Sequence, residues 1–556
     1  MISVFATLCI AWSVPAMAPP AGAATPVVTP PSSVAHDCSV DVTSALNAWF
    51  SGLASNATVS LPAHACYLVS NSPTTTLRLQ ALRGVTIDGN GATFSQTSYD
   101  DGRCGENVVQ PILWLQANDH LAINNVVLRG PGTCGGASNE GDYGLLMGQS
   151  GVGNSNVTLD RVTIENTGGD GLAIMPLLGT GTGINSNIVF ENGVLSTLGY
   201  HALTLEGVNG LLFTGNAVSG FRNFADLEVD NNCVYTGPTS GCYDSSGAPT
   251  STAQWNVSIT GNTFTHATGF GNWIESEQGT CIPQKNLDIE NNFLDRSVDG
   301  TIVLTGSGST CPTDTNLTIA GNTSLAPSLS PCGGSIAAPP SCALVEVSDY
   351  SSVTISHNSL AAFDGQPGYF PNTLYTPCIA LGGVHMASIT DNVCNNTLPA
   401  PLQVGLQFPP ADESVTGLTQ CGNTYGLTEP VVPSGAAAAP APSPVPDGSC
   451  TTSGGNPPAP PPTPAPAPSG GGTSGGPSGV PTGSSRPGGS SGPGGGTGAV
   501  PTPTTGGAPS PPRRGGPSRH LASQPRFGSI RMVRGATGSG GTPHVRTSGQ
   551  HPGPHR

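Results

Sequence analysis

The most constraining feature of this sequence is a short motif that recurs at a nearly constant interval. Each copy alternates apolar and polar residues and then turns through a polar corner, as in Val257-Ser-Ile259-Thr-Gly-Asn262. The second apolar position falls at residues 87, 123, 159, 190, 213, 259, 289, 319, 355 and 389, so most copies lie 30 to 36 residues apart. Such alternation is typical of a strand with one buried face. The sequence therefore predicts one short strand and one turn per repeat.

A second apolar segment follows most copies of the motif. These segments are Gly144-Leu-Leu-Met147, Gly171-Leu-Ala-Ile174, Ala202-Leu-Thr-Leu205, Asp226-Leu-Glu-Val229, Trp273-Ile-Glu-Ser276 and Thr301-Ile-Val-Leu304. One repeat cannot bury its own apolar face, but stacked repeats bury a continuous core. We therefore predict an all-β solenoid, a parallel β-helix of roughly eleven rungs over residues 81–425. Asparagine suits its corners because it tolerates the left-handed conformation and can form hydrogen-bonded ladders between rungs.

The segments that flank the solenoid have other compositions. Residues 38–80 are predicted to form a cap and the first strands. Within them Asp41 to Leu53 reads as a helix that covers the open apolar end, with one face formed by Ala45, Leu46, Trp49, Phe50 and Leu53. Residues 431–512 are rich in Pro, Gly and Ser without apolar periodicity, which predicts a disordered linker. Residues 513–556 add Arg and His, and we predict a disordered tail with two alternative interpretations: it contacts anionic cell-wall polymer, or it is a frameshifted or misread end of a GC-rich gene.

Several features indicate export from the cell. Residues 1–24 are apolar and end in small residues, as in a secretory signal peptide. The even number of cysteines beyond Cys9 and the lack of a Cys-x-x-Cys pair favour structural disulfides in an oxidising compartment. We predict these pairings without fixing the connectivity: Cys38–Cys66, Cys104–Cys134, Cys233–Cys242, Cys281–Cys311, Cys332–Cys342, Cys378–Cys394 and Cys421–Cys450.

Charge narrows the range of partners. Up to Pro430 the chain has 8 Lys and Arg against 32 Asp and Glu, whereas the remainder has 9 Arg against one acid. An acidic body excludes nucleic acid as the expected partner, because phosphate binding requires clustered cations. The body has no apolar run long enough for an integral membrane span.

The N-terminal part of the body resembles a known superfamily. The resemblance rests on Asp41-Val-Thr-Ser-Ala-Leu46, Val59-Ser-Leu-Pro62, Tyr67-Leu-Val69 and Val85-Thr-Ile-Asp-Gly-Asn-Gly-Ala-Thr-Phe94, which look like the beginning of right-handed β-helix proteins of the pectate-lyase-like superfamily. It covers about residues 38–425 and implies a right-handed coil. The superfamily includes polysaccharide lyases, glycoside hydrolases, epimerases and non-catalytic surface proteins. The polygalacturonase-like motifs Asn-Thr-Asp, Gly-His-Gly and Arg-Ile-Lys and the epimerase Asp-Pro-His are absent, so no catalytic residue carries over.

Aligning the second strands places chemistry-bearing residues side by side, because equivalent residues of adjacent rungs lie about 4.8 Å apart. This alignment gathers Glu206, Glu228, Asp230, Glu275 and Glu277 into one acidic patch, with Asp170 and His201 beside it. We predict a catalytic set of Glu228, Glu275, Asp170, His201 and Asp226, and a substrate-binding set of Tyr143, Trp273 and Asn272. Asp230, Glu277 and Glu206 are the residues that would bind Ca²⁺, which takes six to eight oxygen ligands.

The patch allows three interpretations. Crowded carboxylates supply an acid and a base for glycoside hydrolysis. Alternatively they bind Ca²⁺ or sugar, or they form a solvated polar face without function. The leading hypothesis is a secreted glycoside hydrolase acting on a neutral extracellular polysaccharide. The alternatives are a non-catalytic surface or adhesive module, favoured by the low charge and scarce aromatics, and a polysaccharide lyase.

Overall fold

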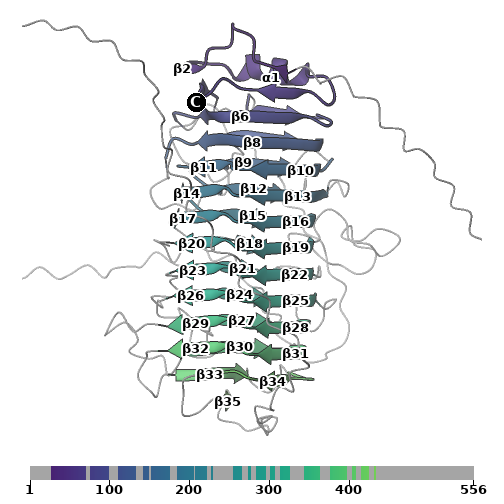
Figure 1. Cartoon of the computed structure of the whole chain (residues 1–556), viewed down its shortest axis with the longest axis vertical. Coiled ribbons are helices and arrows are strands. Elements are labelled where there is room, and N and C mark those ends of the chain that lie inside the picture. Colours follow the sequence, from purple (N-terminus) through teal and green to yellow (C-terminus); the bar gives the residue numbers. More distant parts are fainter. Residues whose placement is uncertain are drawn as a thin grey trace, which may run out of the picture. The chain divides into compact units, whose positions relative to one another are not determined.

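The protein is a right-handed parallel β-helix. The computed structural model describes residues 27–70, 75–98, 110–132, 142–148, 152–175, 184–205, 207–221, 227–229, 254–265, 273–276, 284–295, 301–306, 314–325, 344–362, 376–396, 403–408, 415–424 and 431–433. In this part of the chain the strands pair in parallel and stack rung upon rung (Figure 1). The rungs are built from three ladders of strands, and a complete rung passes through all three. The predicted fold class is confirmed, whereas the predicted signal peptide and most of the predicted linker and tail lie outside the described residues.

Ladder 1 is the sheet that carries the candidate site, and it runs down the centre of Figure 1. Its strands are β5 (Leu77–Gln80), β7 (Leu113–Gln116), β9 (Leu145–Gly148), β12 (Leu172–Met175), β15 (Leu203–Leu205), β18 (Leu227–Val229), β21 (Ile274–Ser276), β24 (Ile302–Thr305), β27 (Val345–Ser348), β30 (Thr376–Gly382), β33 (Gln403–Phe408) and β35 (Val431–Pro433). The last strand comes from the first residues of the predicted linker. It pairs with β33 and extends ladder 1 by one strand.

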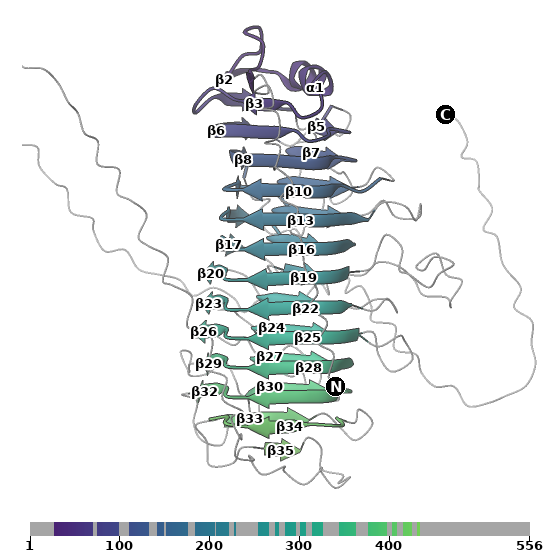
Figure 2. The same ribbon diagram turned by 45° about the vertical axis from the view of Figure 1, so that its right-hand side comes forward.

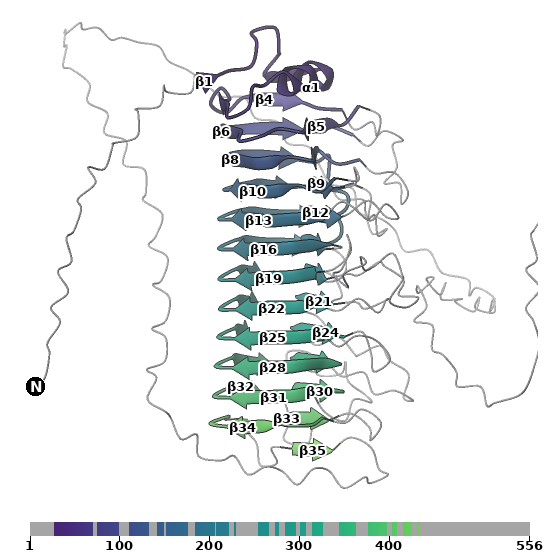
Figure 3. The ribbon, with the colours of Figure 1, turned by 90° about the vertical axis from the view of Figure 1, so that its right-hand side faces the viewer.

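Ladder 2 contains the strands of the repeated motif and faces the viewer in Figure 3. It consists of β1 (Val27–Val28), β3 (Thr58–Ser60), β6 (Thr86–Ser95), β8 (Asp119–Arg129), β10 (Ser155–Asp160), β13 (Asn185–Glu191), β16 (Val208–Thr214), β19 (Gln254–Thr260), β22 (Lys285–Glu290), β25 (Asp314–Ala320), β28 (Tyr350–Ser356), β31 (His385–Thr390) and β34 (Thr419–Cys421). Phe213 pairs with Ile259, so the chain advances by one rung between these two residues despite their longer spacing.

Ladder 3 follows ladder 2 after a two-residue corner, and the corner is seen at the left of the stack in Figure 2. Its strands are β2 (Asp37–Asp41), β4 (Cys66–Leu68), β11 (Thr163–Glu165), β14 (Val194–Leu198), β17 (Ala217–Phe221), β20 (Thr263–Thr265), β23 (Phe293–Asp295), β26 (Thr323–Leu325), β29 (Ser359–Ala362) and β32 (Val393–Asn396). The second halves of β6 and β8 complete it. These two long strands bend through the corner and join ladders 2 and 3 into one sheet.

The core is the inside of this coil. The inward residues of the motif, such as Val257 and Ile259, are buried, while the alternating Ser258 is half-buried on the outside. Full burial of one such aliphatic side chain stabilises the fold by about 1.5–3 kcal/mol. Because every rung repeats the pattern, one hydrophobic core runs from Val34 to Cys394. The period-two pattern of the sequence therefore fixes which side chains remain on the surface.

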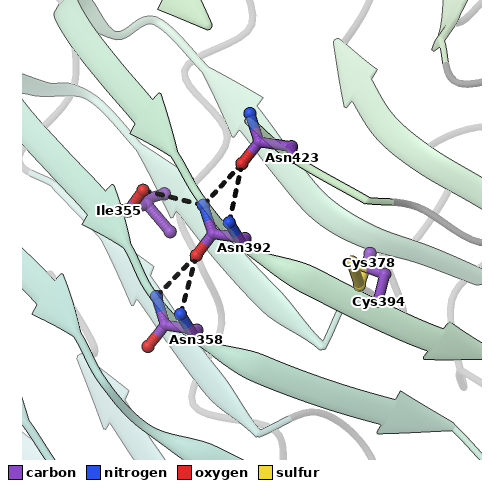
Figure 4. The surroundings of a disulfide bond; sticks show 6 residues. All are labelled: Ile355, Asn358, Cys378, Asn392, Cys394 and Asn423. Atoms are coloured by element: carbon purple, nitrogen blue, oxygen red, sulfur yellow. Dashed lines mark hydrogen bonds between the residues drawn. A yellow bond between two sulfur atoms is a disulfide. The ribbon is translucent and has the colours of Figure 1, made fainter. Parts of the chain in front are cut away.

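From Asn216 onward, the corner between ladders 2 and 3 is held by an asparagine ladder that is buried up to Asn392 and half-buried at Asn423. Its members are Asn216, Asn262, Asn292, Asn322, Asn358, Asn392 and Asn423. From Asn262 on, the Oδ1 of each member accepts two hydrogen bonds from the asparagine of the preceding rung, one from its backbone N–H and one from its Nδ2. Figure 4 shows three of its members. The predicted ladder is confirmed, but the left-handed residue is the preceding one, such as Gly261 or Asn291.

The corner between ladders 1 and 2 changes its chemistry along the coil. In the first rungs it has a second buried ladder formed by Asn118, Asn154 and Asn185. Further along, the equivalent column contains Gln284, Asp314 and Tyr350, all buried. The Tyr350 hydroxyl donates to Gln284 Oε1, and the Gln284 N–H donates to Asp314. Burial, followed by the nearby Asp314 carboxylate, raises the pKa of Tyr350 well above its usual value.

The predicted cap is the helix α1 (Thr43–Ser51). Leu46 and Phe50 are buried against the first rungs, and Trp49 is half-buried. Ala45 is exposed, contrary to the prediction, and Thr43 is buried in addition. Its hydroxyl donates to Asp41 and accepts from the Ser70 N–H, so this end of the cap is fixed by polar contacts that apolar periodicity does not reveal.

Two disulfides confirm predicted pairings. Cys38–Cys66 links β2 to β4, and Cys378–Cys394 links ladder 1 to ladder 3 within one rung (Figure 4). Cys421 is also disulfide-bonded. Its predicted partner Cys450 lies outside the described residues, as do both cysteines of the pairs Cys104–Cys134, Cys233–Cys242, Cys281–Cys311 and Cys332–Cys342.

Candidate functional site

The candidate site lies along one column of register positions in ladder 1, which we call the middle column. Its members, in rung order, are Arg78, Trp114, Leu146, Ala173, Thr204, Glu228, Glu275, Val303 and Glu346. The sequence alignment predicted this register from Leu146 to Val303, and the strand pairing agrees with it at every step. Glu228 and Glu275 are therefore direct neighbours in adjacent rungs.

Burial varies along the middle column. Arg78 and Trp114, nearest the cap, are half-buried, and the next three members, Leu146, Ala173 and Thr204, are buried. Glu275 and Glu346 are half-buried again, so the acidic residues of the later rungs follow a covered stretch of the column. Of Glu228 the structure describes only the backbone position. Asp226, Asp230, Glu277, Glu206 and Asn272 lie outside the described residues, so their predicted roles stay predictions.

Asp170, His201 and Thr204 form a buried hydrogen-bonded group beside these carboxylates. Asp170 and His201 occupy the position two residues before β12 and β15, one rung apart, and Thr204 stands in the middle column. Thr204 Oγ1 donates to Asp170 Oδ2 over 2.8 Å, and His201 Nδ1 lies 3.2 Å from the same hydroxyl. The His201 N–H donates to Asp170 Oδ1 over 3.1 Å. All three side chains are at most 4% exposed.

An apolar cluster adjoins this group toward the cap. Tyr143, Leu146, Ala173 and Met175 form a buried cluster separate from the core, and Trp114 packs against it. Trp114 donates from Nε1 to the Gly148 carbonyl, and the Arg78 guanidinium lies 4.6 Å from the centre of its ring. Tyr143, a predicted substrate-binding residue, is therefore in the neighbourhood of Asp170, but it is only 5% exposed.

Trp273 has a different environment from the one that its predicted role requires. The side chain is fully buried in the core and packs against Phe264, with ring centres 5.6 Å apart. The residue lies one position before β21, so the alternation that turns Ile274 inward and Glu275 outward does not set the direction of its indole. A ring buried on both faces presents no surface on which a sugar could stack.

Two residues of this neighbourhood were not singled out from the sequence. Glu346 lies two rungs beyond Glu275, and continuing the alignment to Leu344-Val-Glu-Val347 would have found it. Thr204 was in the alignment, but a threonine among carboxylates carries no chemical signal of its own. Only the contacts of its hydroxyl with Asp170 and His201 reveal its position.

A separate carboxylate pair lies on ladder 2, away from the middle column. Asp288 and Glu290 are alternate residues of β22 and are both half-buried on its outer face. Burial, followed by the charge of Asp288, raises the pKa of Glu290. Ser258 and Thr260 occupy the same positions one rung earlier. Because this strand belongs to another ladder, the pair offers a matched reference for the carboxylates of ladder 1.

Within the described ranges, no group of three or more His, Cys, Asp and Glu side chains is arranged to hold a metal ion. The predicted Ca²⁺ ligands fall outside these ranges, so the Ca²⁺ hypothesis is untested. In the same part of the chain, no helix has the length and apolar character needed to cross a membrane.

Comparisons with known proteins find similar folds at low identity. No family model matches the sequence, and no curated protein matches it. Among solved structures, the A-module of a mannuronan C-5 epimerase from Azotobacter vinelandii is 12% identical, with a TM-score of 0.46, covering 72% of this chain and 97% of that one. A family 28 exopolygalacturonase from Yersinia enterocolitica is 10% identical, with a TM-score of 0.40 and coverages of 72% and 79%. PfbA, a surface adhesin of Streptococcus pneumoniae, is 11% identical, with a TM-score of 0.37 and coverages of 70% and 91%.

Proposed function

We propose that this protein is a secreted glycoside hydrolase that acts on extracellular polysaccharide, with Glu228 and Glu275 as its pair of carboxyl groups. The supporting observation is their register: the two residues are direct partners in adjacent rungs of ladder 1. Thr204 is the register partner of Glu228 on its other side, and its hydroxyl contacts buried Asp170 and His201. The similar solved structures include both polysaccharide-acting enzymes and an adhesin, so the choice between these roles depends on the residues of this chain.

The spacing of the rungs predicts the stereochemical course. Adjacent backbone positions lie about 4.8 Å apart, which suits the separation of about 5 Å between the carboxyl groups of a retaining glycosidase. Glu275 and Glu346 are two rungs apart, at about 9.6 Å, which is close to the upper limit for an inverting enzyme. A Glu228–Glu275 pair therefore predicts retention at the anomeric carbon. Inversion would move the assignment to Glu275 and Glu346.

The chemistry of the pair requires that one carboxyl be protonated and the other ionised. Two carboxyl groups in adjacent rungs repel each other when both are charged, so one of them holds its proton to a higher pH. The protonated group donates to the leaving glycosidic oxygen, and the ionised group attacks the anomeric carbon or stabilises its positive charge. The disulfides and the acidic body suit an extracellular location for this reaction.

The test is a product assay on neutral and acidic polysaccharides with the full secreted chain, with and without Ca²⁺. New reducing ends without the ultraviolet absorbance of unsaturated sugars are expected. Absorbance would identify a lyase, and no product from the folded protein on any polymer would leave the binding module as the function. On a cleaved polymer, Glu275→Gln and Glu228→Gln should each lower kcat by about 100-fold or more. Glu290→Gln, the matched change on ladder 2, should leave kcat unchanged.

A further inference from the structure

The hydrogen bonds that join Asp170, Thr204 and His201 all run in one donor-to-acceptor direction, which follows from the chemistry of the three side chains. Thr204 Oγ1 has one hydrogen to donate, and it donates this hydrogen to Asp170 Oδ2. The same oxygen lies 3.2 Å from His201 Nδ1 and has lone pairs left to accept with. The contact between them is a hydrogen bond only if His201 Nδ1 carries the hydrogen. The chain of donors therefore runs from His201 through Thr204 to Asp170.

Asp170 is the end of this chain because both of its oxygens accept. Oδ1 receives the His201 backbone N–H, and Oδ2 receives the Thr204 hydroxyl. Both oxygens therefore act as acceptors, as those of a carboxylate do. The His201 Nδ1 atom is also 3.8 Å from Asp170 Oδ1, so the negative charge favours a hydrogen on this side of the ring. Burial of all three residues strengthens these interactions, since little water competes for them.

We propose that Thr204 is a positioning residue that keeps a hydrogen on His201 Nδ1, so that His201 gains and loses its proton only at Nε2. The catalytic part of this inference rests on the proposed function. With Nδ1 occupied, the neutral ring can only accept at Nε2, and the protonated ring can only donate there. His201 is then a directed acid–base group one strand from Glu228, whose register partner is Thr204.

The fold explains why these three residues meet. Asp170 and His201 occupy equivalent places in consecutive rungs, and Thr204 is three residues beyond His201 in the middle column. The Tyr200 ring lies against the imidazole, with ring centres 3.7 Å apart, and limits its rotation. A residue with a hydroxyl is needed at position 204, because it must accept from one partner and donate to the other. Serine retains this ability and valine loses it.

The primary test measures the His201 tautomer in the wild-type full chain by nitrogen NMR of protein labelled at histidine. The chain has 11 histidines, and the His201 signals are assigned by their loss in His201→Gln, or through bonds to the backbone if that variant does not fold. The expected result is a hydrogen on Nδ1 at every pH at which the protein is folded. A neutral ring protonated on Nε2 overturns the proposal, and it would mean that the chain of donors starts at a protonated Asp170.

The variants test the role of the hydroxyl. Thr204→Val, which has nearly the same shape, should give a mixture of tautomers, whereas Thr204→Ser should keep the hydrogen on Nδ1. On a polymer that the wild-type protein cleaves, Thr204→Val should lower kcat by at least about 10-fold with little change in KM. Thr204→Ser should have a kcat close to that of the wild type. A Thr204→Val protein with the wild-type tautomer and kcat would overturn the proposal. The tautomer is read without substrate, so failure of the proposed hydrolase activity remains distinguishable from failure of this inference.

Discussion

Asn292 provides the sharpest test of what holds the rungs in register. Its Nδ2 donates to the Ile259 carbonyl over 2.8 Å and to Asn322 Oδ1 over 3.0 Å. Its Oδ1 accepts the backbone N–H and the Nδ2 of Asn262, both over 3.0 Å. Asn292 is 1% exposed. Replacing it with alanine removes four hydrogen bonds at a place that water does not reach.

The expected loss follows from what remains of each partner. Asn262 Nδ2 still donates to the Phe213 carbonyl, and Asn322 Oδ1 still accepts the Asn292 backbone N–H. The backbone N–H of Asn262 loses the partner it had in Asn292. A buried donor without a partner costs about 1–3 kcal/mol, and each further lost bond costs about 0.5–1.5 kcal/mol. We expect Asn292→Ala to lower the free energy of unfolding by about 3–5 kcal/mol.

The assay is urea unfolding followed by far-ultraviolet circular dichroism, with Asn286→Gly as the matched control. Asn286 belongs to the same rung, is exposed, and exchanges side-chain hydrogen bonds with Asn256 and Asn316. Its φ is 57°, where glycine is favourable, so this change should cost about 1 kcal/mol or less. A loss for Asn292→Ala below about 1 kcal/mol, or no greater than the control, would show that the buried ladder does not stabilise the coil.

Two further predictions concern buried groups. The Tyr67 hydroxyl finds no hydrogen-bond partner within the described residues, so Tyr67→Phe should raise the free energy of unfolding by about 1 kcal/mol. Burial raises the pKa of Tyr67 from 10.0 to about 12. The free energy of unfolding that the neutral phenol contributes is therefore fully present below about pH 10 and should decline toward pH 12 in the wild type. Urea titrations at each pH should show that Tyr67→Phe lacks this decline. The Cys378–Cys394 bond closes a loop of 16 residues, so replacing both cysteines with alanine should lower the free energy of unfolding by about 3 kcal/mol. A loss below about 1 kcal/mol in the same titration would count against that estimate.

The regular part of the fold could be predicted because each rung repeats the same local pattern. The alternation in Val257-Ser-Ile259 specifies an inward and an outward face, and the following Gly-Asn specifies a corner. Which residue of that corner is left-handed was less clear, since asparagine suits both positions. The structure assigns the left-handed position to Gly261 and the stacked position to Asn262, because only the stacked side chain reaches the next rung.

The candidate site could be predicted as far as register, but not as far as contacts. Stacking one repeat on the next gave Glu228 and Glu275 as neighbours, and it brought Asp170 close to His201. The same argument placed Trp273 at the site, but its ring is buried in the core. A residue just before a strand can face either way, and the sequence pattern does not say which.

The sequence by itself determined the coil, its repeat length and the buried face of each strand. These follow from periodicity and from residues close in the chain, so local physics is sufficient to specify them. Only the tertiary structure decided that Thr204 joins Asp170 to His201. This group joins two neighbouring rungs, and it depends on where the stacked backbone places each side chain.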